Sequence, residues 1–362
     1  MMKAKKTCSL LAVLTAAAMF TACGATAASD SSASSSTGEV AATAAPAASA
    51  AATAESAGVT YPITIPHAYG ETVIEAKPER VAAIGWGNGD VPLALGVVPV
   101  GVSMANFGAV GEDGLLPWTS AAFTALGEDS PVVYDDTDGL DFEAISDSDP
   151  DVILAAYSGI TQEEYDTLSQ IAPVVAYPES AWQTYWRQET LMNGEAMGMK
   201  PEAEALVADT EALIADKLAA HPALEGKTAA FLWVDATDFS TFYVYLPTDP
   251  RANFLLDLGF TFPENIEALN TDPTAFSITM SAENVDALMD LDIIVAYGDD
   301  AVLKAMQADP LMGTVPAVAN GAVVMLPSDG ALSASSNPTV LSIPDTLDDY
   351  LALLNTAAEN IK

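Results

Sequence analysis

Two segments of the chain repeat one short pattern. Residues 80–86 and 227–233 each consist of a basic residue, an apolar run and a final tryptophan. In both halves, fourteen residues separate a glutamate from a tyrosine that ends an apolar run: Glu143 and Tyr157, then Glu283 and Tyr297. The repeat predicts one α/β lobe that is present twice. Two similar lobes that face each other form a cleft, and ligand pockets favour such interfaces.

The N-terminus has the features of an export signal. Residues 1–22 have three lysines among the first six positions and continue into an apolar run at 9–20, which is too short to span a bilayer. Cleavage before Cys23 resembles processing of a bacterial lipoprotein, so we expect Cys23 to carry a lipid and to anchor the protein to the outer face of the cell membrane. An ordinary signal peptide with an incidental cysteine is the alternative. Cys23 is the only cysteine after the signal, so an intramolecular disulfide is excluded.

Residues 23–58 are dominated by alanine, serine and threonine and contain no aromatic residue. Such a segment cannot bury a core, and we expect a flexible tether. The remaining chain, 59–362, exceeds the usual size of one core and predicts two domains. The formal charge of −38 excludes nucleic-acid binding, because phosphate contacts need clustered lysines and arginines.

The order of apolar and helical patterns predicts the arrangement of the lobes. Strands at 81–86, 97–102, 152–157 and 173–177 alternate with helices, including one at 161–170 with a capping box, and indicate a mostly parallel sheet. The segment 201–221 has a helical pattern that no strand interrupts. Strand patterns then return at 228–234, 242–245, 292–297 and 322–326. We expect an N-terminal lobe at 59–199, a connecting helix at 200–222 and a C-terminal lobe at 223–362.

Five segments together resemble ABC-transporter binding proteins for ferric siderophores: Ala76-Lys-Pro-Glu-Arg-Val-Ala-Ala-Ile84, Leu95-Gly-Val-Val-Pro-Val-Gly-Val102, Phe142-Glu-Ala-Ile145, Asp149-Pro-Asp-Val-Ile-Leu154, and the leucine, alanine, proline and valine pattern of 165–175. The resemblance covers nearly all of the chain after residue 61. It implies two α/β lobes joined by one long helix, with the ligand in the cleft between them. It also implies a ferric siderophore as ligand and delivery to a permease dimer with a cytoplasmic ATPase.

Large aromatic residues are candidates for the walls of that cleft. Ligands lie beyond the carboxyl ends of strands in open α/β sheets, where the sequence places Trp86, Tyr157 and Tyr297. Burial in the core is the competing interpretation, and we favour it for Trp233. Five further aromatics are predicted in loops or at a helix start or strand end, so we assign them to the site: Trp118, Trp182, Trp186, Tyr243 and Tyr245.

Arginines are rare, and each is therefore informative. Arg80 precedes a strand and is expected to be structural, whereas Arg187 and Arg251 follow aromatic residues in opposite lobes. The resemblance implies that the latter two meet the oxygens around the iron, since a guanidinium offers paired donors. Surface salt bridges are the alternative. A trianionic ferric catecholate would need more positive charge than two arginines provide, so a hydroxamate or mixed siderophore is favoured.

Glu143 and Glu283 match the positions at which the resembled family presents glutamates to its permease. A solvated acid at a helix start is the alternative for each. The chain has only two histidines, His67 and His221, which disfavours a metal site. The sequence also contains no nucleophile-and-base motif that would indicate an enzyme. We expect a monomer without a cofactor. Iron would bind only as part of the ferric siderophore. Haem, a corrinoid, or a sensory or adhesive role remain open, and residues 333–337 are expected to form a rim loop.

Overall fold

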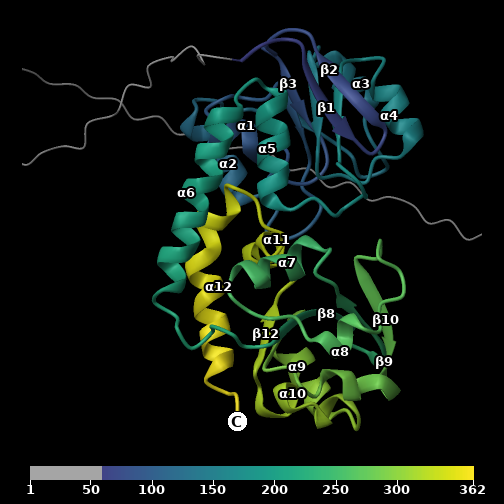
Figure 1. The fold of residues 1–362 in the computed structure, drawn as a ribbon, viewed down its shortest axis with the longest axis vertical. Coiled ribbons are helices and arrows are strands. Elements are labelled where there is room, and N and C mark those ends of the chain that lie inside the picture. Colours follow the sequence, from purple (N-terminus) through teal and green to yellow (C-terminus); the bar gives the residue numbers. More distant parts are fainter. Residues whose placement is uncertain (1–58) are drawn as a thin grey trace, which may run out of the picture. The chain divides into compact units, whose positions relative to one another are not determined.

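The computed structural model describes residues 59–362. The predicted signal peptide (1–22), Cys23 and the tether (23–58) lie outside the described residues. The described part forms two five-stranded sheets and a two-stranded hairpin, with helices packed against each sheet (Figure 1). None of its helices is long and apolar enough to cross a lipid bilayer.

The first sheet is parallel throughout, with the strand order β5-β4-β3-β6-β7. Its two central strands are apolar and buried along their whole length, as expected for a parallel sheet covered on both faces. Its strands, preceded by the hairpin, are β1 (Ile63–His67), β2 (Gly70–Ile74), β3 (Val81–Ala83), β4 (Gly101–Ser103), β5 (Val133–Tyr134), β6 (Val152–Ala155) and β7 (Val174–Ala176).

Two helices of this lobe begin at a side-chain cap, and α2 (Pro117–Ala125) begins at a proline. Thr161 caps α4 (Gln162–Leu168) and forms the predicted capping box with Glu164. Asp141 caps α3 (Phe142–Asp147) by accepting from the Ala144 amide. The remaining helices are α1 (Asp90–Ala94) and α5 (Trp186–Ala196).

The second sheet has the corresponding order β10-β9-β8-β11-β12 but mixed directions. Strands β8, β11 and β12 run parallel, whereas β9 and β10 are antiparallel to their neighbours. Strands β9 and β10 depart from the mostly parallel arrangement because a turn of two residues, 236–237, joins β8 to β9, and a parallel crossover needs a dozen or more. The strands are β8 (Ala229–Asp235), β9 (Asp238–Tyr245), β10 (Ser277–Ser281), β11 (Ile293–Tyr297) and β12 (Val323–Leu326).

The predicted duplication is therefore confirmed in the order of the strands. The two repeated apolar runs become β3 and β8, the central strand of each sheet, and the two runs that end in tyrosine become β6 and β11 beside them. The helices of the second lobe are α7 (Pro250–Asp257), α8 (Glu264–Glu267), α9 (Asp300–Ala308), α10 (Pro316–Asn320) and α11 (Ala331–Ser335), with the 3₁₀ helices η1 (Ala282–Leu288) and η2 (Met312–Thr314).

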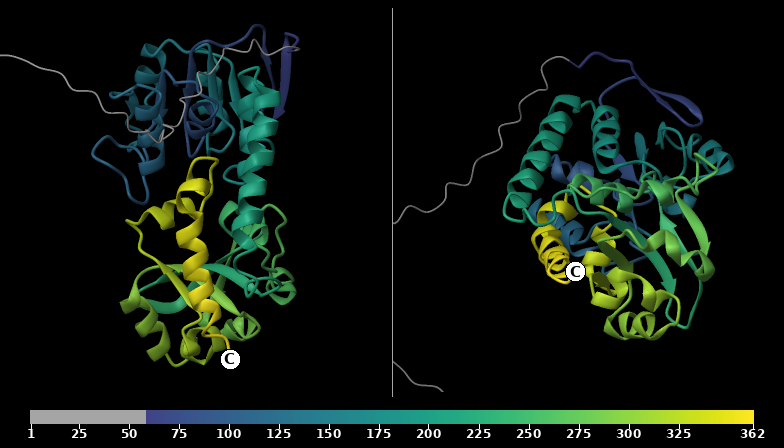
Figure 2. Two further views of the ribbon diagram at one scale, coloured as in Figure 1. Left: turned by 90° about the vertical axis from the view of Figure 1, so that its left-hand side faces the viewer. Right: turned by 60° about the horizontal axis from the view of Figure 1, so that its bottom comes forward.

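One helix joins the two lobes, and a second helix packs along it. The expected connecting helix is α6 (Lys200–Leu218), and α12 (Ser342–Ala358) packs along it (Figures 1 and 2). The Lys217 ammonium lies 2.5 Å from the Asp348 carboxylate across this pair. Apolar side chains of α6, α12 and both sheets belong to one continuous core. The chain thus crosses between the lobes through the single helix α6, as the sequence indicated, and the C-terminal helix α12 reinforces it by packing alongside.

Candidate ligand-binding site

A cavity of about 550 Å³ is lined by residues of both lobes. The first lobe contributes the segments that follow β3, β4, β5 and β6. The second lobe contributes the end of β11, the start of α7, and α11 with the residues after it. The carboxyl ends of strands in both sheets therefore face the cavity, as is usual for ligand sites in open α/β folds.

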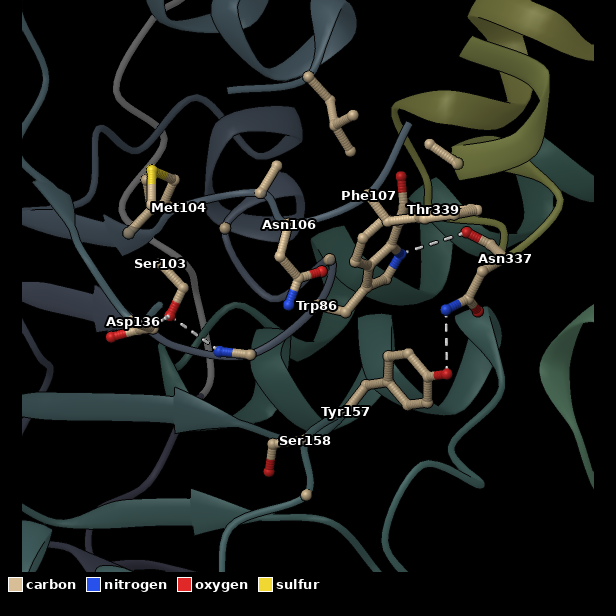
Figure 3. A pocket seen from close by; sticks show the side chains of 18 of the residues that line it. Trp86, Ser103, Met104, Asn106, Phe107, Asp136, Tyr157, Ser158, Asn337 and Thr339 are labelled. Carbon is tan, nitrogen blue, oxygen red and sulfur yellow. Dashed lines mark hydrogen bonds between the residues drawn. The ribbon is translucent and has the colours of Figure 1, made fainter. Parts of the chain in front are cut away.

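Trp86 and Tyr157 form one wall of the cavity, and Asn337 joins both to the second lobe (Figure 3). The Asn337 amide donates to the Tyr157 hydroxyl at 2.9 Å, and the Trp86 indole N–H donates to the Asn337 carbonyl at 3.4 Å. Gly85 has a φ of +79°, and a Cβ there would lie 2.8 Å from the Tyr157 carbonyl oxygen. Glycine thus permits the turn after β3 that brings Trp86 beside Tyr157.

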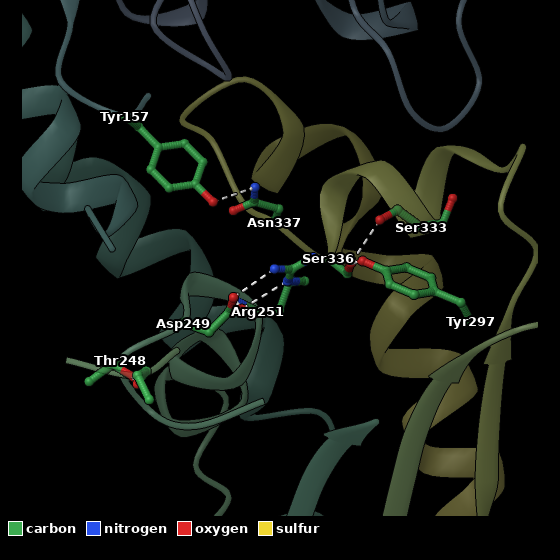
Figure 4. Close-up of polar contacts among 9 residues, drawn as sticks. Tyr157, Thr248, Asp249, Arg251, Tyr297, Ser333, Ser336 and Asn337 are labelled. Atoms are coloured by element: carbon green, nitrogen blue, oxygen red, sulfur yellow. Dashed lines mark hydrogen bonds and ion pairs between the residues drawn. The ribbon is translucent and has the colours of Figure 1, made fainter. Parts of the chain in front are cut away.

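Arg251 is the basic residue of the opposite wall (Figure 4). Asp249 caps α7 and also binds the guanidinium through both carboxylate oxygens, at 2.8 Å to Nε and 2.6 Å to Nη2. The Tyr245 ring lies under the guanidinium, 4.1 Å from its carbon to the ring centroid. Burial alone would lower the pKa of Arg251, but Asp249 raises it above the ordinary value, so the side chain remains charged.

Further aromatic side chains widen the apolar surface. Trp182 has a φ of +61°, is 42% exposed, and lies edge-on to Tyr157 with ring centroids 5.4 Å apart. Tyr297 packs edge-on against Phe107 at 5.1 Å. Phe276, in the loop before β10, is 42% exposed and also lines the cavity. Flat rings on several elements suit a wide ligand with apolar surface.

Sequence reasoning missed several residues of the cavity. Phe107 and Phe276 lie in loops, and Met104, Asn106 and Asp136 are the principal others. The position after β4 was a usable signal for Phe107, because the same rule had selected Trp86 and Tyr157. No local pattern marks Phe276. The predicted rim at 333–337 does line the cavity through Ser333, Ala334 and Asn337, but most of it belongs to α11.

A buried polar cluster adjoins the first-lobe wall. Asp90 accepts hydrogen bonds from the Trp118 indole at 3.0 Å, the Thr119 hydroxyl at 2.7 Å and the Thr339 hydroxyl at 2.5 Å. Burial raises the pKa of Asp90 to about 6, and these hydrogen bonds limit the rise. Burial and the nearby Asp90 charge raise the pKa of Glu189 well above its ordinary value. Among residues 59–362, the Glu189 Oε1 atom has no hydrogen-bond partner.

Trp118, Trp186 and Arg187 do not line the cavity. Trp118 was predicted in a loop, but it lies in α2 and is 4% exposed, because its indole supports Asp90. Trp186 is buried and donates to Asp257 at 3.0 Å. Arg187 binds Glu211 and Asp257 at 2.5 and 2.6 Å, which is the salt-bridge alternative left open by the sequence.

The aromatic residues of β8 and β9 also differ from expectation. Trp233 is 39% exposed, so its expected burial is wrong; alternation along β8 places it on the face opposite Val234. It packs on Tyr243 of β9, with centroids 5.3 Å apart. Neither residue lines the cavity, and Tyr245 reaches it only by supporting Arg251.

The remaining predicted residues, Arg80, Glu143 and Glu283, lie outside the cavity lining. Arg80 donates to the Ser148 and Asp149 carbonyls, in keeping with a structural role. Glu143 and Glu283 are both exposed in the first turn of a helix, α3 and η1 respectively. Their role as docking residues stays a prediction. Among residues 59–362, no three histidine, cysteine or acidic side chains gather as a metal site.

Two α/β lobes, a packed helix pair between them and an interlobe cavity define a bilobal solute-binding protein. Residues 81–329 match the sequence profile of the periplasmic binding protein family, and the chain belongs to that family. Its relatives are substrate-binding proteins of transporters and not enzymes.

Known proteins of this family resemble the chain over most of its length. The crystal structure of PiaA from Streptococcus pneumoniae in complex with ferrichrome is 48% identical, with a TM-score of 0.80, covering 83% of this chain and 100% of that one. The ferric enterobactin-binding periplasmic protein FepB of Escherichia coli is 25% identical over 74% of this chain and 84% of its own. The ferric-anguibactin-binding protein FatB of Vibrio anguillarum is 25% identical over 80% of this chain and 87% of its own.

Proposed function

We propose that this protein captures a ferric siderophore of the hydroxamate type outside the cytoplasm and delivers it to an ABC permease for iron uptake. A lipid on Cys23 and a tether over 23–58 would keep the binding lobes close to that permease. Iron takes part only as cargo inside its chelate.

The observation that carries the proposal is the composition of the interlobe cavity. Its volume of about 550 Å³ falls within the range of about 300–1,000 Å³ for ligand pockets. Trp86, Tyr157, Trp182 and Phe276 offer apolar ring surfaces, and Arg251 offers N–H donors to chelating oxygens. The similar protein PiaA was solved with ferrichrome, which supports a ferric hydroxamate over other chelates.

Ferrichrome binding tests the proposal through tryptophan fluorescence. Trp86 and Trp182 line the cavity, so we expect ferrichrome to quench the emission of the purified protein. Arg251→Ala should weaken binding by about 1.5–3 kcal/mol, the range for hydrogen bonds to a charged group. Arg187→Ala is the matched control, because Arg187 lies outside the cavity, and we expect little change in affinity.

A panel separates this function from its alternatives. Haem and cobalamin should leave the fluorescence unchanged at concentrations that saturate with ferrichrome. Tighter binding of either would identify a different cargo for the same cavity. Unaltered ferrichrome affinity in Arg251→Ala would remove the guanidinium from the site.

A further inference from the structure

Asp249 is the sole carboxylate that contacts Arg251 among the described residues, and it is almost inaccessible. Its side chain is 1% exposed, against 20% for Arg251. One oxygen accepts from the Arg251 amide at 2.9 Å and from Nε at 2.8 Å, and the other accepts from Nη2 at 2.6 Å (Figure 4). Because Asp249 also caps α7, the helix start fixes the carboxylate beneath the guanidinium.

This pair changes the charge of the cavity. Arg251 is the only lysine or arginine among the residues that line it, and the buried Asp249 offsets its charge. The other ionisable acids of the lining are Asp90, Asp136 and Glu164. The cavity therefore carries no net positive charge, although it contains a guanidinium.

The pair nevertheless leaves hydrogen-bonding capacity. A guanidinium has five N–H donors, and Asp249 takes two of them, one from Nε and one from Nη2. The remaining N–H groups on Nη1 and Nη2 form a fork that acceptor oxygens of a ligand can use. The Tyr245 ring supports the plane from below at 4.1 Å.

We propose that Asp249 is a specificity-determining residue, which makes the cavity select neutral ferric chelates and reject anionic ones. Three hydroxamates neutralise Fe³⁺, whereas three doubly charged catecholates leave a charge of −3. Arg251 can donate hydrogen bonds to either, but only an unpaired guanidinium would add the long-range attraction that favours the anion. This inference rests on the proposed function, since it concerns the same cavity and cargo.

The test compares ferrichrome, a neutral ferric hydroxamate, with ferric enterobactin, a trianionic ferric catecholate. We expect the wild-type protein to bind ferrichrome at least tenfold more tightly. Asp249→Asn should shift the ratio of the two dissociation constants by about tenfold toward ferric enterobactin, which equals about 1.4 kcal/mol. Added salt should weaken enterobactin binding more in the variant than in the wild type, because the unpaired charge is screened.

Asp149→Asn is the control. Asp149 also lies beside an arginine, Arg80, at 3.8 Å, but it is 92% exposed and outside the cavity. Its φ of +49° suits asparagine, so the same loss of charge should leave the selectivity unchanged.

The outcomes separate the two proposals. If the wild type binds neither chelate, the proposed function fails. If it binds ferrichrome but prefers ferric enterobactin, or if the ratio is unchanged in Asp249→Asn, the role of Asp249 is overturned. Asp249→Ser keeps a capping oxygen without the charge and gives the same readout should the asparagine variant fold poorly. An equal shift in Asp149→Asn would show a general effect of net charge and would also overturn it.

Discussion

Single residues in this protein are constrained by how their polar atoms are satisfied after burial. Glu189 is 2% exposed, and within the described part of the chain its Oε1 atom has no hydrogen-bond partner. The Oδ1 atom of Asn193, one turn further along α5, has none there either. Both atoms are acceptors when Glu189 is ionised. Burial and the nearby Asp90 charge penalise the ionised carboxylate, so the folded protein favours the neutral acid.

The protonation of Glu189 predicts a pH dependence of stability. Its folded pKa is raised, so the folded state holds a proton that the unfolded state has released. The stability that the protonated Glu189 contributes is therefore present below the unfolded pKa. It is lost as the pH rises from the unfolded pKa through the folded pKa. We expect Glu189→Gln, which cannot ionise, to gain stability relative to the wild type as the pH increases from 4.5 to 8.

Urea unfolding across this pH range measures the effect. Glu204→Gln, an exposed position on α6, is the control and should track the wild type. A constant difference between Glu189→Gln and the wild type at every pH would contradict a protonated Glu189.

At the scale of elements, α11 and the residues after it belong to the second half of the sequence but complete a wall built mainly by the first lobe. Asn337 binds the Tyr157 hydroxyl, and Thr339 binds Asp90. Ala334 packs with Leu116 and Trp118 in a small cluster of the first lobe. This segment therefore holds together residues that are far apart in sequence.

Removing the Asn337 side chain should loosen that wall. In Asn337→Ala the Tyr157 hydroxyl loses its donor, at a cost of about 1–3 kcal/mol if no water replaces it. We expect faster amide exchange over 157–160 and faster release of ferrichrome. Asn360→Ala removes an exposed amide that binds the Gly321 carbonyl and should affect neither. Identical exchange over 157–160 in the Asn337 variant would show that α11 does not support this loop.

At the scale of the whole molecule, each lobe presents one exposed glutamate on an equivalent element. Glu143 follows the cap Asp141, and Glu283 follows the cap Ser281. Matching carboxylates on a duplicated body suit a partner with two-fold symmetry. Because both lie outside the cavity lining, docking and ligand binding can be tested separately.

The double substitution Glu143→Ala with Glu283→Ala should slow cellular uptake of iron from ferrichrome while leaving ferrichrome affinity unchanged. Asp147→Ala with Asp286→Ala removes two charges further along the same helices and serves as the control. Full uptake by the Glu143 and Glu283 double variant would refute docking through these residues.

The apolar runs alone determined most of the architecture. Four apolar residues without alternation in β6, and the matching run in β11, are typical of strands buried on both faces, and their repetition implied two lobes. The positions of Trp86, Tyr157 and Tyr297 in the cavity lining could also be predicted, because ligand sites in open α/β sheets lie beyond the carboxyl ends of the strands. The direction of β9 was missed because a two-residue turn carries no apolar signal.

Only the tertiary structure decided which of the other candidates line the cavity. Arg187 and Arg251 look alike in sequence, each following aromatic residues. In the folded chain Arg187 forms ion pairs with Glu211 and Asp257. Arg251 pairs with Asp249 and lines the cavity. The packing of α12 on α6 and the return of Asn337 to the first lobe likewise have no local signal. Local patterns determine which face of an element is buried, whereas the partner of a polar side chain depends on chain segments that only folding brings together.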